Sequence, residues 1–195
     1  MENSNRSLQK EGTHRKILKA AFKVYSEKGF GAPTSLIAKE AGVAHGSVFL
    51  HFPTLNDLLS SLIEDFGETL CSRLHERLEP GGAIEGLLEA HIGILSEYEM
   101  FYTKLISETV LLPDDARTTV AMIQTSLACH FHKALAEGIG SGALKRLPPH
   151  ILFNAWIGLI HYYLQNKDFF SPEGPVLKRY EKHLIFTYCE LIRRQ

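Results

Sequence analysis

The 195-residue chain is 45% hydrophobic, which supports a real core, and its first dozen residues are polar, which argues against a signal peptide. Its three cysteines, Cys71, Cys129 and Cys189, are odd in number and widely spaced, which excludes a disulfide framework and suits a reducing compartment. The longest strongly apolar run, residues 155–160, is too short to span a bilayer, so we expect a soluble, cytoplasmic protein with no membrane partner.

The formal net charge is only −1, and an even spread of that charge would argue against a nucleic-acid partner. The charge is uneven, because residues 1–58 hold eight basic and five acidic side chains and so carry +3, which leaves −4 for residues 59–195. A basic segment on an acidic remainder can orient toward phosphate. Solvated helix faces would account equally well for any single lysine.

The amino-terminal segment predicts two helices after a polar start. Residues 1–12 are expected to form a flexible basic arm that can reach a minor groove. Apolar side chains recur at helical spacing over residues 17–25, with Thr13 as the N-cap and Gly29 as the stop. The proline that opens residues 33–41 fits the first position of a second helix.

Residues 37–52 are typical of two short helices joined by a glycine turn. Ala38 is small enough for a close helix crossing, and Gly42 supplies the turn. The side chains expected to pack inward are Val43, Val48 and Phe52. The side chains left outward are His45, Ser47, Phe49 and His51. This pattern indicates a DNA-binding helix-turn-helix, and an ordinary three-helix bundle is the alternative.

A long helix is predicted next, over residues 55–79. Thr54 and Asp57 form a capping box in its aspartate variant, and an apolar stripe runs from Leu58 to Leu78. At 1.5 Å per residue this helix would be roughly 37 Å long, enough to link the amino-terminal segment to the rest. Residues 80–82 are expected to end it.

The remaining pattern is also helical, and no strand pattern is found. Further helices are expected over residues 84–99, 101–109 and 114–138, after the prolines at 148–149, and after Pro172 to Pro175, with residues 138–142 as a loop. The predicted fold class is therefore all-α with about nine helices: a three-helix head at residues 13–54 and a larger helical body at residues 55–195.

Three elements of this head resemble the tetracycline-repressor (TetR) family of bacterial transcription regulators: the Ile37-Ala38 pair, the turn at residues 41–43 and the ending His51-Phe52. The resemblance covers residues 13–59 by motif and the remainder by length and helical pattern. It implies a ligand-responsive regulator, most often a repressor, that is released from its operator by a small-molecule inducer. The alternative is a helical small-molecule-binding or protein-interaction module with weak or no DNA binding.

The resemblance also implies a homodimer, because in that family the last two helices pair with their copies across a two-fold axis. Gly158 fits such pairing, since a glycine inside a helix costs about 1 kcal/mol against alanine and is best explained by a close helix crossing. That crossing could lie between chains or within one chain. A dimer with recognition helices about 34–36 Å apart would bind a palindromic double-stranded operator.

By resemblance, His45 and Ser47 face base edges and His51 contacts phosphate, while Thr34 and Ser35 offer hydroxyl groups to phosphate. The full set of candidate DNA-contacting residues is Thr34, Ser35, Ala44, His45, Ser47, Phe49, Leu50 and His51. Each position is also compatible with plain exposure to solvent.

Three departures from the family pattern bear on DNA affinity. Phe49 stands where a tyrosine hydroxyl usually reaches the DNA backbone, and Leu55 replaces the usual lysine at the start of the long helix. The loop between the first two helices is one residue shorter, which affects the register of residues 32–34. Fewer phosphate contacts predict weaker and less salt-sensitive binding.

The family further implies a ligand cavity among the middle helices, and an apolar or aromatic small molecule is expected there. Candidate lining residues are Phe66, Leu70, His91, Leu95, Phe101, Leu105, Ile123, Leu127, Phe131, Trp156 and Ile160. The same positions also fit ordinary core packing. His91 or His161 could supply a polar contact, although a lone histidine on an apolar face usually has a partner in the core.

The sequence holds no complete catalytic or metal-binding motif. Cys71 and His75 share a helix face, but no second pair completes a metal site, and His130 and His132 diverge on their helix. Residues 140–142 lack the strand-turn-helix setting of a nucleophile elbow. Without a phosphate-binding glycine loop or a dinucleotide motif, we expect no enzyme activity, no metal and no cofactor.

Overall fold

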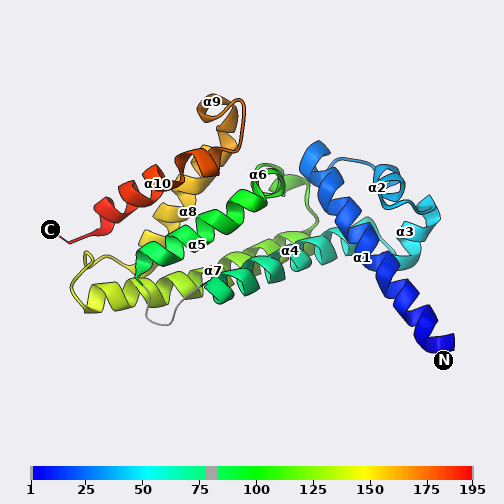
Figure 1. Ribbon diagram of the computed structural model, residues 1–195, viewed down its shortest axis with the longest axis horizontal. Helices are drawn as coiled ribbons and strands as arrows, with labels where there is room; N and C mark the ends of the chain where they lie inside the picture. Colours follow the sequence, from blue (N-terminus) through cyan, green and yellow to red (C-terminus); the bar gives the residue numbers. More distant parts are fainter. Residues whose placement is uncertain (1, 78–82, 195) are drawn as a thin grey trace.

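The computed structural model describes residues 2–77 and 83–194, with side chains from residue 7 onward, and these ranges form ten α-helices, one 3-10 helix and no strand (Figure 1). The elements are α1 (Glu2–Lys28), α2 (Thr34–Ala41), α3 (His45–His51), α4 (Leu55–Arg77), α5 (Ile84–Glu97), α6 (Glu99–Ser107), η1 (Thr109–Leu111), α7 (Asp114–Gly140), α8 (Pro149–Gln165), α9 (Lys167–Phe170) and α10 (Val176–Ile192). The predicted all-α class is confirmed.

Helices α1 to α3 pack around a small core of their own. Its largest fully buried side chains are Ile17, Tyr25, Ile37 and Phe52. Gly42 ends α2 in the left-handed region, at φ 67°, and the backbone N–H of Val43 donates to the carbonyl of Ala38 at 3.0 Å. This glycine stop turns the chain sharply enough for α3 to cross α2, as the sequence predicts.

The start of α1 differs from the prediction. The helix runs from Glu2 rather than Thr13, and the hydroxyl of Thr13 donates to the carbonyl of Gln9 one turn earlier instead of capping an end. Residues 2–12, expected to be a flexible arm, are therefore helical here. The run Leu8-Gln9-Lys10-Glu11 favours helix and no proline interrupts residues 2–12, so the helix continues through Gly12 to residue 13.

Helix α4 begins with the predicted capping box. The backbone N–H of Thr54 donates to a carboxylate oxygen of Asp57 at 2.8 Å, and the backbone N–H of Asp57 donates back to the Thr54 hydroxyl at 3.1 Å. This reciprocal pair satisfies N–H groups that the first turn leaves free. The predicted end of the helix at residues 80–82 lies outside the described residues.

Two boundaries in the body differ from the predicted ones. The break between α5 and α6 falls at Tyr98, and α7 continues through Gly140, into the segment expected to be a loop. The short elements α9 and η1 were not predicted, because three or four residues are too few to show a helical period.

In the body, α4 and α7 lie side by side, and α5 runs through the middle of the fold (Figure 1). Helices α8 and α10 pack on each other, with α8 also against α6 and α7 and α10 also against α5. The head joins this body where α1 meets α4 and α6. No helix in the described part of the chain is long and apolar enough to cross a membrane.

Candidate DNA interface and ligand site

Helix α3 turns two side chains inward and leaves most of the others on the surface. Val48 and Phe52 are each 1% exposed and fix the helix to the head core, while Val43 is half-buried beside them. On the outer side, Ala44, His45, Phe49 and Leu50 are exposed and Ser47 is half-buried. The predicted inward and outward faces are confirmed here, except that His51 and Ser47 are partly covered.

A hydrogen bond that the sequence did not reveal joins the starts of α2 and α3. The hydroxyl of Thr34 lies 2.9 Å from Nε2 of His45, whose ring meets the edge of Phe49 at 5.4 Å between centroids. Thr34 therefore positions the histidine on the outer face of α3. Ser35, the other hydroxyl predicted on this side, is exposed.

His51 is less exposed than the sequence predicts for a phosphate contact. It is half-buried, and its Nδ1 has no hydrogen-bond partner among the described residues. The His51 ring lies 6.1 Å from the ring of His14, which packs on Phe52 at 4.4 Å. Burial lowers the pKa of His51, and the neighbouring charges of His14 and Lys10 lower it further. A neutral imidazole can offer phosphate an N–H donor but not a positive charge.

Two of the basic side chains of the head are paired locally. Arg15 contacts Glu11 at 2.6 Å, and Lys23 of α1 contacts Glu40 of α2 at 2.7 Å. The apolar side chains of Leu50, 79% exposed, and Leu55, 42% exposed, lie near the end of α3 and the start of α4. Lys16, Lys19 and Lys39 are exposed and make no ion pair with any residue whose side chain the structure describes, so the outer surface of the head combines unpaired lysines with exposed apolar groups.

The body buries the predicted ligand-contacting residues. Ten of the eleven are buried and Ile123 is half-buried. Phe66 meets Phe101 edge-on at 5.1 Å near the head, and His91 meets Phe131 edge-on at 5.5 Å within the body. These contacts equally serve as core packing, so the ligand-binding role remains a prediction.

His91 is the most unusual polar group of this core. Its ring is 1% exposed, and Nδ1 accepts a hydrogen bond from the indole N–H of Trp156 at 3.0 Å. The neutral ring then carries its proton on Nε2, which has no partner among the described residues. Burial and the charge of His161 lower the pKa of His91 to about 3. The core therefore holds a neutral N–H donor without an acceptor.

Two glutamates join distant segments of the chain. The buried carboxylate of Glu99 accepts hydrogen bonds from the backbone N–H groups of Val176 at 2.7 Å and Leu177 at 2.9 Å, and so caps α10. Glu108, after α6, accepts from the backbone N–H of Phe30 at 2.7 Å. A Cβ at Gly29 would lie 2.5 Å from that carboxylate, so glycine is needed beside it.

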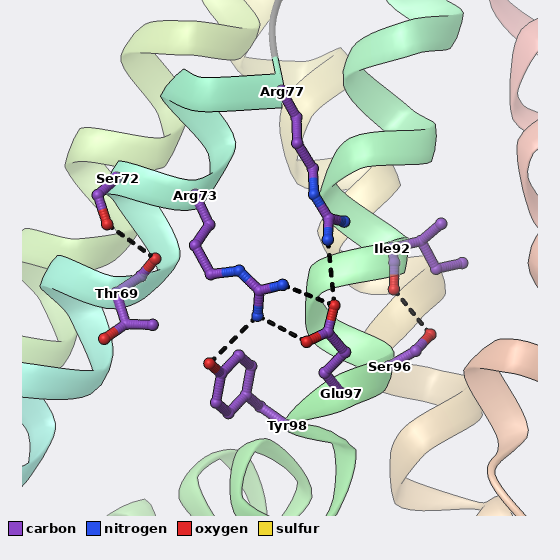
Figure 2. A network of polar contacts seen from close by, with 8 residues as sticks. All are labelled: Thr69, Ser72, Arg73, Arg77, Ile92, Ser96, Glu97 and Tyr98. Carbon is purple, nitrogen blue, oxygen red and sulfur yellow. Dashed lines mark hydrogen bonds and ion pairs between the residues drawn. The ribbon is translucent and has the colours of Figure 1, made fainter.

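An ion-pair network fastens α4 to α5 (Figure 2). The guanidinium of Arg73 contacts both carboxylate oxygens of Glu97, at 2.6 and 2.8 Å, and donates to the hydroxyl of Tyr98 at 3.2 Å. Arg77 adds a third contact to Glu97 at 3.1 Å. The two guanidinium groups hold the pKa of Glu97 below its usual range, with Arg73 the larger influence.

Helices α8 and α10 expose large apolar side chains. These are Ile151 and Tyr162 on α8 and Phe186 and Leu191 on α10. Gly158 is exposed on the same helix as Ile151, and a Cβ placed there would meet nothing within 4 Å. A close helix crossing within the described chain does not explain this glycine.

The structure defines a class of protein: a three-helix head of helix-turn-helix geometry on a larger helical body. Residues 17–62 match the family described as bacterial regulatory proteins, tetR family. The uncharacterized HTH-type transcriptional regulator YvdT of Bacillus subtilis is 31% identical over 124 residues, which are 62% of this chain and 55% of that regulator. The chain thus spans about half the length of this curated relative.

Solved structures extend the fold similarity to nearly the whole chain. The regulator FadR from Bacillus subtilis, in complex with stearoyl-CoA, has a TM-score of 0.73 at 21% identity, over 90% of this chain and 97% of that one. The ketosteroid regulator KstR2 of Mycobacterium tuberculosis has a TM-score of 0.70 at 16% identity, over 93% and 95%. This chain therefore shares a match over residues 17–62 with the tetR family of bacterial regulatory proteins, and it shares its fold with these two solved regulators.

Proposed function

We propose that this protein is a cytoplasmic transcriptional repressor that binds a palindromic operator as a homodimer and is released by a small apolar inducer. Residues 13–54 would read the DNA, and residues 55–195 would bind the inducer and dimerise. The observation that carries the proposal is the outer face of α3, where His45, Phe49 and Leu50 are exposed above the anchors Val48 and Phe52. A rigid helix with exposed side chains at its start suits the major groove.

Dimerisation is supported by the surface of α8 and α10. Phe186, which is 68% exposed, and Tyr162 are large apolar groups that a partner would cover. Gly158 lets a second helix approach closely, because nothing of its own chain fills the space beside it. Replacement of Phe186 by Glu is expected to yield monomers in analytical ultracentrifugation. Val110→Glu, at an apolar residue exposed elsewhere, should leave the dimer intact.

The inducer is proposed to bind in the body core. The unpartnered N–H of His91 favours an uncharged ligand group with an acceptor oxygen, such as a carbonyl, on an otherwise apolar molecule. FadR, which shares the fold, was solved in complex with stearoyl-CoA and so offers a precedent for a ligand with a long apolar chain. Release from DNA would require that the inducer bind the displaced arrangement of the heads more tightly than the DNA-bound one.

The test is a gel shift with DNA from upstream of the protein's own gene, followed by footprinting. The proposal predicts a protected site with two-fold symmetry that overlaps the promoter. The second candidate is a ligand-binding or protein-interaction module, and Leu55 supports it, because this exposed side chain at the start of α4 is apolar and offers phosphate no positive charge. Absence of any specific shift, with the protein folded and dimeric, would favour that module.

A further inference from the structure

A cleft lies where α1 crosses α4. It has a volume of about 330 Å³, and one wall is formed by Lys19 and Phe22 of α1. The opposite wall is formed by Asp65, Phe66 and Thr69 of α4, and Tyr98 also lines the cleft. This volume is at the lower limit of small-molecule sites, so it suits a compound of one or two rings.

The aromatic lining of the cleft is held in place by its neighbours. The ring of Tyr98 meets Phe22 edge-on at 5.9 Å and Phe66 edge-on at 5.6 Å. Arg73 donates a hydrogen bond to the Tyr98 hydroxyl (Figure 2), and the Arg73 guanidinium lies 5.8 Å from the centroid of the Tyr98 ring. Phe22 and Tyr98 are half-buried and leave part of each ring open to a ligand, while the buried Phe66 supports Tyr98 from behind.

The charged rim of the cleft carries one free cation and one free anion. Lys19 and Asp65 stand on opposite walls, and neither makes an ion pair within the described residues. The third charged lining residue, Arg15, is already paired with Glu11. Two opposite charges that do not meet each other can be bridged by a ligand that carries both signs.

We propose that this cleft binds a small aromatic zwitterion, an aromatic amino acid or a close analogue. The ligand carboxylate would contact Lys19, its ammonium group would contact Asp65, and its ring would pack against Phe22, Phe66 and Tyr98. One wall belongs to the head and the other to the body, so occupancy would favour one orientation of the head over others. The binding itself does not depend on the DNA-binding proposal.

Calorimetric titration of the full chain without DNA tests the site with three probes: L-tryptophan, tryptamine, which lacks the carboxylate, and indole-3-propionate, which lacks the ammonium group. L-tryptophan should bind more tightly than either analogue. Lys19→Ala should weaken L-tryptophan about fivefold, in the range of exposed charge contacts, and leave tryptamine unchanged. Asp65→Asn should weaken L-tryptophan similarly and leave indole-3-propionate unchanged.

Two further variants separate a site effect from a general one. Lys16→Ala removes an exposed cation of α1 that does not line the cleft, and it should leave all three affinities unchanged. Thr69→Trp should fill the cleft and abolish binding of every probe while the charges stay in place. The proposal is overturned if L-tryptophan does not bind, if it binds no better than both analogues, or if Thr69→Trp leaves its affinity unchanged.

Discussion

The head and the body differ in where they place key polar side chains: the head has one on its surface, and the body has two in its core. In the head, His45 stands outside, above a small apolar core that includes Val48. In the body, His91 and Glu99 are buried, and each is bonded to a partner more than 60 residues away in sequence. Substitutions on the outer face of the head should therefore leave the free energy of unfolding unchanged. Substitutions of the buried polar groups of the body should lower it.

The largest effect is expected at Glu99. Replacement by Ala leaves two N–H groups at the start of α10 without their acceptor in a buried position, which should lower the free energy of unfolding by about 3 kcal/mol. Urea denaturation measures this loss. Glu64→Ala, at an exposed position of α4, is the matched control. Equal losses in the two variants would show that the body does not depend on this carboxylate.

A pH dependence is expected next, from His91. An ordinary histidine gains a proton below about pH 6.5, while the folded pKa here is about 3. The unfolded chain therefore binds more protons in this window, and stability should fall as pH drops, by roughly 2 kcal/mol from pH 7 to pH 5. The lowered pKa of His161 acts in the same direction.

The matched variants are His91→Gln, whose amide oxygen can still accept from Trp156, and His132→Gln, at an exposed residue. The His91 variant should lose most of this slope between pH 7 and pH 5. The His132 variant should keep it. Identical slopes in both variants would remove His91 as the cause.

A smaller effect is expected where the head meets the body. Glu108→Ala removes the acceptor of the Phe30 N–H, which should cost about 1 kcal/mol at this half-buried position. Hydrogen exchange at the Phe30 amide should accelerate accordingly. Glu137→Ala, at an exposed residue of α7, is the control, and unchanged exchange at Phe30 would contradict a junction held by Glu108.

The features that the sequence predicted correctly involve residues that are close to each other along the chain. The capping box of Thr54 and Asp57 and the turn at Gly42 depend on neighbours within four residues, and both were predicted. Val48 and Phe52 follow from helical spacing in the same way. Such local patterns defined the turn between α2 and α3 and the inward face of α3, whereas the start of α1 and the Thr34–His45 hydrogen bond were missed.

The missed features connect residues that no local spacing relates. Glu108 meets Phe30 across 78 positions, and Trp156 meets His91 across 65. The predicted start of α1 was wrong for a different reason: Thr13 has the chemistry of a cap, but the run Leu8-Gln9-Lys10-Glu11 before it favours helix, and the helix continues past Thr13.

The most direct test of the central claim is fluorescence anisotropy of labelled operator DNA with the wild type, His45→Ala and His132→Ala. If the outer face of α3 reads the bases, His45→Ala should lower affinity for the operator about tenfold, because one base contact is lost in each half-site. Its unfolding free energy should stay within about 0.5 kcal/mol of wild type, as for other surface substitutions. His132→Ala should bind as the wild type does. Unchanged affinity of a folded His45→Ala protein would contradict the assignment of α3 as the DNA-reading helix.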